Sequence, residues 1–240
     1  MQKLKSKKNI LIAVACVLLV AVVIGITLSF FSDDDNAENV FAVGDVRLSL
    51  VEQNYPQKAS DRVMYSNSII PKDPMIINTG DNPEYVYMLV TLPLENVTLL
   101  NDDGTKPDGA TPQNVEIFNL ISNAENPLIE NNISYDDNWI FIGKSTDTDT
   151  NTYIFAYNKV LEKSEKTSTL FDKVQLKSFI EGETGENAVK NIGVKACGIQ
   201  SDNLMGVELP TDTDTREVLA TKLTSIYNIC ARQNGQVVIE

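Results

Sequence analysis

The sequence predicts a mainly β protein, a jelly-roll-like antiparallel β-sandwich with one or two decorating helices. Several short segments alternate apolar and polar side chains, which is the pattern of half-buried strands. One segment is apolar on both faces, as expected for the centre of a sandwich. Turn-forming Asn, Asp, Gly and Pro residues separate these segments, and a region near the C-terminus has helical spacing.

The first predicted strand spans residues 40–51 and is buried on one face. Val46, Leu48 and Leu50 form its apolar face, with polar residues between them. Residues 173–180 repeat this alternation of one dry and one solvated face.

Residues 85–92 form the segment that is apolar on both faces, bounded by Pro83 and Pro93. This pattern predicts a central strand. Trp139, the only tryptophan, is followed by apolar residues and is expected in the core. The remaining predicted strands are residues 115–121, 139–142, 153–157 and 192–199.

Turns are predicted at residues 79–83, 101–104 and 107–109, because Asn, Asp and Gly tolerate a positive φ. Residues 145–152 (Ser-Thr-Asp-Thr-Asp-Thr-Asn-Thr) are interpreted as a polar loop.

A helix is predicted at about residues 214–232. Asp214 is its expected N-cap, Glu217 completes a capping pair, and Gly235 follows its end. A second, weaker helix is predicted at residues 112–122. The apolar stripe of the first helix consists of Leu219, Leu223, Ile226, Tyr227 and Cys230.

The N-terminus has the order of an export signal. Four lysines precede an apolar run over residues 10–31, and three aspartates follow at 33–35. A signal-peptide core has ~7–15 apolar residues and a membrane span needs ~20, so this segment is either a cleaved signal or a retained anchor. The lysines indicate a cytoplasmic N-terminus, with the acidic side outside.

Cleavage is expected before Phe30, since Thr27 and Ser29 place small residues at the −3 and −1 positions. The predicted organisation is a signal peptide or retained anchor at 1–29, a β-sandwich domain at 30–202, and a C-terminal extension with the helix at 203–240.

The predicted mature part is strongly acidic. The whole chain has 20 basic and 33 acidic residues, and residues 1–29 hold four of the basic ones and no acidic one. Residues 30–240 therefore carry 16 basic and 33 acidic residues, a net charge of −17. This charge argues against nucleic acid and anionic lipid as partners, and leaves the N-terminal segment as the only expected membrane contact.

Two cysteines lie outside the leader, Cys197 and Cys230. An even pair in an oxidising location is compatible with a disulfide. Two buried thiols that act as small apolar side chains are the other interpretation, and it is slightly favoured because Cys230 lies on the apolar face of the predicted helix.

No catalytic motif is present. The chain has no histidine, which excludes Ser-His and Cys-His nucleophile systems and histidine-ligated metals. We therefore expect no enzyme and no cofactor. Calcium is the one candidate ligand, because alternating carboxylates offer oxygen atoms; the candidate residues are Asp147, Asp149, Asp212 and Asp214.

Four segments carry a family resemblance. They are Phe-Phe-Ser-Asp at 30–33 with Asn-Val-Phe-Ala-Val-Gly-Asp-Val at 39–46, Ile-Pro-Lys-Asp-Pro-Met-Ile-Ile-Asn-Thr-Gly at 70–80, the region 139–174, and the final strand at 192–202. In this order they resemble the TasA/camelysin family of biofilm-matrix proteins. The usual alanine at the cut is absent, and residues 203–240 have no counterpart.

The resemblance implies a secreted subunit of extracellular matrix fibres, held at the membrane as a precursor and released by a dedicated signal peptidase of the SipW type. It also implies that the N-terminal segment of one subunit adds as a strand to the next. The donor-strand candidates are Phe30, Phe31, Val40, Phe41, Ala42 and Val43.

Two other functions remain as alternatives. A monomeric cell-surface binding or adhesion module fits the same fold, with Tyr153 and Tyr157 as residues of one face. A protease is suggested by the camelysin name, but the missing histidines and metal motif argue against it.

Overall fold

The computed structural model describes residues 46–239, apart from 102, 181 and 185–189. The predicted mainly β fold is confirmed, with sheets that are antiparallel except for one parallel pairing, β6 with β8. The strands are β1 (Leu48–Glu52), β2 (Ile69–Pro71), β3 (Pro74–Asn78), β4 (Glu84–Val97), β5 (Gln113–Glu116), β6 (Phe118–Ile121), β7 (Leu128–Glu130), β8 (Ile133–Tyr135), β9 (Trp139–Thr146), β10 (Thr150–Tyr157), β11 (Lys173–Leu176) and β12 (Gly193–Gln200). The helices are the short 3-10 helix η1 (Ala59–Arg62) and α2 (Arg216–Asn234).

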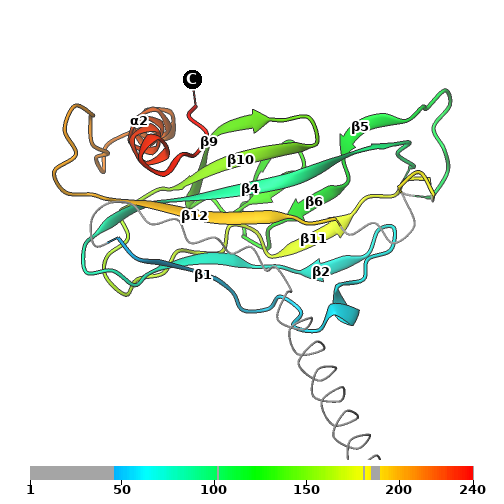
Figure 1. Cartoon of the computed structure of the whole chain (residues 1–240), viewed down its shortest axis with the longest axis horizontal. Helices are drawn as coiled ribbons and strands as arrows, with labels where there is room; N and C mark the ends of the chain where they lie inside the picture. Colours follow the sequence, from blue (N-terminus) through cyan, green and yellow to red (C-terminus); the bar gives the residue numbers. More distant parts are fainter. Residues whose placement is uncertain (1–45, 102, 181, 185–189, 240) are drawn as a thin grey trace, which may run out of the picture. The chain divides into compact units, whose positions relative to one another are not determined.

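The strands form two layers (Figure 1). One layer has the order β12-β4-β10-β9, with β5 paired to the far end of β4. The other has the order β2-β11-β6-β8-β7, and the β1-β3 pair continues it, because β3 bonds to the chain just before β11. The apolar core between the layers includes Met88, Leu120 and Phe155.

β4 is the central strand that the sequence predicted. Its even-numbered side chains from Val86 to Leu92 face the core between the layers. Tyr85, Tyr87 and Leu89 face the other way and pack with residues of α2. Both faces of β4 are therefore buried, which is why this segment is apolar throughout.

β4 continues past Pro93, which was expected to end it. Thr91 is the last residue paired with β12, and Leu94 is the first paired with β5. Pro93 lies between these two stretches and pairs with neither β12 nor β5, while the pairing with β10 continues through it.

The weaker helix predicted at residues 112–122 is wrong, and the strand predicted at 115–121 describes this region better. The chain forms β5 and then β6, and changes layer at Ile117: β5 pairs with β4, and β6 pairs with β11. Partner strands on both sides of this crossing decide the conformation, which local spacing does not reveal.

The polar loop predicted at residues 145–152 is shorter than expected. β9 continues to Thr146 and β10 begins at Thr150, so the loop is a tight hairpin turn. Thr91 and Thr152 lie side by side with their hydroxyl oxygens 2.9 Å apart. Threonine is polar but favours strands, which explains why the threonine-rich ends of these two strands were predicted to be loop.

α2 lies over the outer face of the β4 layer (Figure 1). Leu223, Ile226 and Tyr227 of the predicted stripe are fully buried there. The predicted N-cap is wrong: Thr215 caps the helix by accepting a hydrogen bond from the Val218 amide. Gly235 ends the helix in the left-handed region, at a φ of 63°.

Within the described part of the chain, no helix has the length and apolar character of a membrane span.

Candidate functional site

The border between the two layers at β1 and β12 is the candidate assembly site. β12 is an edge strand of its sheet, and β1 is an edge strand of the β1-β3 pair. Figure 1 shows the two strands next to each other, and they are in contact. Among the described residues, no strand pairs with the outer edge of either one. An edge of this kind is a template for a further strand.

The hydrogen-bond register identifies the outward-facing backbone groups of β12. The Ser201 amide donates to the Pro83 carbonyl at 2.9 Å, in register with the β12–β4 ladder. Bonded pairs alternate along an antiparallel ladder, so the amides of Val194, Ala196, Gly198 and Gln200 point away from β4. The same argument applies to β1. The Thr79 amide bonds to the Arg47 carbonyl, so the backbone amides of Leu48 and Leu50 point away from β3.

β1 reaches β12 at Gly198. A Cβ atom on Gly198 would lie 2.7 Å from a methyl group of Leu48 and 3.0 Å from a carboxylate oxygen of Glu84. Glycine therefore leaves room for the Leu48 side chain, which packs in the core against the inner face of β12, a role that its place in a predicted strand does not reveal.

The Lys-Asp-Pro segment at 72–74 fastens the chain that follows β1. Asp73 accepts hydrogen bonds from the backbone and the side-chain amide of Asn54, at 2.8 and 2.7 Å. The Lys72 ammonium lies 2.7 Å from the Glu52 carboxylate and over the Tyr55 ring. The segment is structural, and it holds β1 in place beside β12.

Asn78 closes the other end of the β1-β3 pair. Its side-chain oxygen accepts from the Gly80 amide, and its side-chain nitrogen donates to the carbonyls of Asn82 and Leu161. It is completely buried, so these bonds satisfy groups that water cannot reach. The Asn-x-Gly pattern is thus a folded turn.

Cys197 and Cys230 form a disulfide between β12 and α2. Both residues are buried in the cluster between the β4 layer and the helix. The C-terminal extension is therefore attached to the same strand whose outer edge is the candidate acceptor.

The four candidate calcium ligands fall into two separate places. Asp147 and Asp149 flank the turn between β9 and β10, where the Asp147 carboxylate accepts from the Thr148 amide. Asp212 and Asp214 precede α2, whose Arg216 donates to carbonyls at the opposite end of β9. Asp214 pairs with Lys222 at 2.9 Å, and this hydrogen bond holds the pKa of Asp214 below its ordinary value.

Tyr153 and Tyr157 do share a face, but it is the buried one. Both pack in the core between the layers, together with Trp139, as expected for the tryptophan. The Trp139 ring donates to the Ser168 carbonyl at 3.2 Å. These aromatic residues stabilise the fold and offer no exposed platform for a ligand.

Sequence reasoning missed a buried polar cluster around Glu116, at the crossing from β5 to β6. One carboxylate oxygen accepts from the Asn151 amide and the Tyr153 hydroxyl, both at 2.6 Å, and the other accepts from the Asn132 amide at 2.6 Å. The Lys144 ammonium lies 3.9 Å from the first oxygen. Burial and then this carboxylate raise the pKa of Tyr153 well above its ordinary value.

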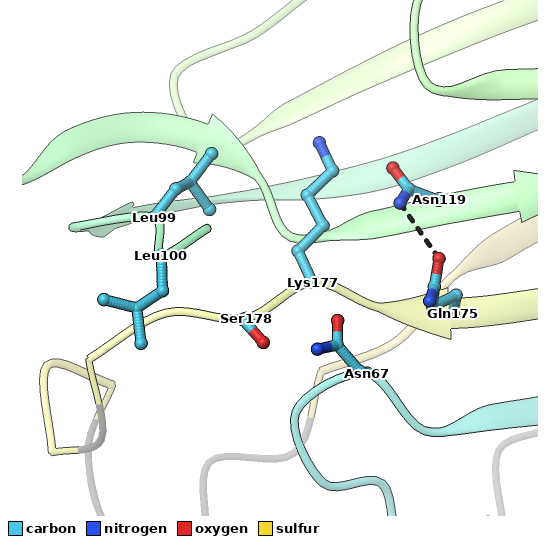
Figure 2. Close-up of a pocket in the computed structure, with 7 residues that line it drawn as sticks. All are labelled: Asn67, Leu99, Leu100, Asn119, Gln175, Lys177 and Ser178. Carbon is cyan, nitrogen blue, oxygen red and sulfur yellow. Dashed lines mark hydrogen bonds between the residues drawn. The ribbon is translucent and has the colours of Figure 1, made fainter. Parts of the chain in front are cut away.

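A small cavity lies nearby, lined by Asn67, Leu99, Leu100, Asn119, Gln175, Lys177 and Ser178 (Figure 2). Asn119 and Gln175, which pair across β6 and β11, lie on one side of it, and the Asn119 amide donates to the Gln175 side-chain oxygen at 3.3 Å. Its volume of about 170 Å³ is below the ~300 Å³ at which ligand pockets usually begin. Burial lowers the pKa of Lys177, while the charge of Glu116 opposes that shift.

The cleavage residues Thr27, Ser29 and Phe30 lie outside the described residues, as do the donor-strand candidates at 30–43. Comparisons with protein-family models, with curated proteins and with solved structures found no match for this chain.

Proposed function

We propose that this protein is a secreted structural subunit of extracellular biofilm-matrix fibres. In this proposal the segment at residues 30–43 of one subunit adds as a strand to the outer edge of β12 on the next. The observation that carries the proposal is the β12 edge, which presents alternate backbone groups outward and has no partner strand among the described residues.

Donor and acceptor on one chain make the contact heterologous. Each subunit then offers one edge and one segment, and head-to-tail contacts that do not close into a ring produce a filament. The donor segment precedes β1 in the sequence, and β1 is in contact with β12, the acceptor strand. Backbone hydrogen bonds supply the affinity of such strand addition, and side chains at alternate positions supply the specificity.

Val194→Pro tests the acceptor edge. Proline removes the outward amide of residue 194, and no bond to β4 depends on that amide. Val194→Ala is the matched control, because it loses more side-chain packing and keeps the amide. We expect fibres in electron micrographs of the wild type and of Val194→Ala, and their loss in Val194→Pro.

A mixing experiment tests donor and acceptor together. The Val194→Pro protein keeps its donor segment, and a variant without residues 30–39 keeps its acceptor edge. Each alone should remain monomeric, and the mixture should form a one-to-one complex in size-exclusion chromatography. Fibres from the truncated variant alone would refute the donor role, and a wild type that stays monomeric would favour the binding module.

A further inference from the structure

The Glu116 cluster brings together an amine, a carboxylate and a primary amide. Lys144 is on β9 and Asn151 is on β10, and the two strands pair so that Lys144 faces Tyr153 and Asn151 faces Thr146. Lys144 and Asn151 are therefore diagonal neighbours on one sheet face. The same oxygen of Glu116 lies 2.6 Å from the Asn151 nitrogen and 3.9 Å from the Lys144 nitrogen.

Glu116 and Asn151 are buried, whereas Lys144 is partly exposed. The side chain of Glu116 is 4% exposed and that of Lys144 is 32% exposed. Asn151 is 6% exposed, and its side-chain oxygen is buried without a hydrogen-bond partner among the described residues. An unsatisfied buried carbonyl of this kind is costly, and it requires an explanation.

We propose that Lys144 and Asn151 form an intramolecular isopeptide bond, with Glu116 as the proton carrier. The Glu116 carboxylate takes a proton from the Lys144 ammonium, and the neutral amine attacks the side-chain carbonyl carbon of Asn151. The bond from the Lys144 nitrogen to this carbon forms, and the carbon–nitrogen bond of the amide breaks. Glu116 returns the proton to the departing nitrogen, which leaves as ammonia. The attacking nitrogen then loses its second proton through Glu116 to that ammonia, which becomes an ammonium ion.

The reaction needs no oxidant and no other reagent. A lysine ammonium and an asparagine amide become a substituted amide and one ammonium ion, and Glu116 ends as it began. Tyr153 has a positioning role: its hydroxyl donates to the same carboxylate oxygen, and its ring lies 5.0 Å from the Lys144 ammonium. The product would join β9 to β10 covalently beside the layer crossing at β5.

Mass spectrometry of the full chain, in the form that the cell exports, tests the proposal. The protein is reduced and denatured, so the disulfide does not contribute and folding does not affect the reading. We expect a mass lower than the composition requires by one ammonia molecule. Trypsin should no longer cleave after Lys144, and fragmentation should yield no ions from breaks between residues 144 and 151.

Three variants locate the chemistry. Lys144→Arg keeps the positive charge and should restore the full mass, as should Glu116→Gln. Lys177→Arg is the matched control and should retain the loss, since Lys177 is another partly buried lysine near Glu116. Circular dichroism checks that each variant folds.

Three results would overturn the proposal. They are a wild type of full mass, an ammonia loss that persists in Lys144→Arg (the result expected from an asparagine succinimide), and a cross-link that maps to another pair of residues.

Discussion

At the scale of single residues, buried polar side chains hold the loops of this sandwich. Asp73 fastens the chain after β1, Asn78 closes the turn after β3, and Glu116 connects the two layers through Asn132 and Asn151. Each accepts or donates at least two hydrogen bonds in a site with little or no water access. Removing one partner from such a site leaves the others unsatisfied, so these residues should be sensitive to substitution.

Asn78→Ala should lower the free energy of unfolding by about 2–3 kcal/mol, because three backbone groups lose their buried partner. Asn101→Ala is the matched control, since Asn101 is exposed and, among the described residues, its side chain bonds only to Thr105 of the same turn. Its effect should remain below about 0.5 kcal/mol. Urea denaturation measures both, and equal losses would show that Asn78 is no more than a turn residue.

Tyr227 should make the fold sensitive to alkaline pH. Burial raises the pKa of Tyr227 to about 12, from 10 in the unfolded chain, so the folded state keeps the proton longer. Stability is therefore unaffected below pH 10 and falls between pH 10 and 12. Tyr227→Phe should flatten this fall without abolishing it, because the pKa values of Tyr87 and Tyr153 are raised too. The measurement is the change in the denaturation midpoint between pH 9 and pH 11. An equal change in the wild type and in Tyr227→Phe would contradict the prediction.

At the scale of elements, one strand has two roles. β12 pairs with β4 on one side and carries the disulfide to α2 on its outer face. Its other edge, which pairs with no strand among the residues that the structure describes, is the proposed acceptor for a strand from the next subunit. α2 covers the outer face of the β4 layer, so the C-terminal extension is an integral part of the sandwich.

Replacing both cysteines by alanine should lower the free energy of unfolding by about 2–4 kcal/mol, because a cross-link over 33 residues restricts the unfolded chain. Reductant should destabilise the wild type by a similar amount and leave the double variant unchanged. Guanidinium denaturation with and without reductant measures this. If reductant does not change the free energy of unfolding of the wild type, the cysteines are buried thiols.

At the scale of the whole molecule, charge opposes the proposed assembly. A net charge of −17 on residues 30–240 repels subunits from one another, and salt screens that repulsion. The strand contact must therefore overcome a cost that depends on ionic strength.

Fibre formation should be faster at an ionic strength of about 0.15 M than at about 0.01 M, because the Debye length shrinks from ~30 to ~8 Å. Light scattering follows the rate. Sodium and calcium chloride at equal ionic strength separate screening from binding: equal rates indicate screening alone, and a calcium-specific gain would direct attention to Asp147, Asp149, Asp212 and Asp214. A rate independent of salt would refute the electrostatic argument.

The sequence by itself determined the fold class, the central strand, the helix and the burial of Trp139, because each depends on a local period of apolar residues. It predicted the partnership of Cys197 and Cys230 only as one of two options. The tertiary structure decided the layer crossing at Ile117, the close approach at Gly198 and the Glu116 cluster. These depend on residues far apart in the chain, such as Glu116, Lys144 and Asn151, and only the pairing of strands determines which of them meet.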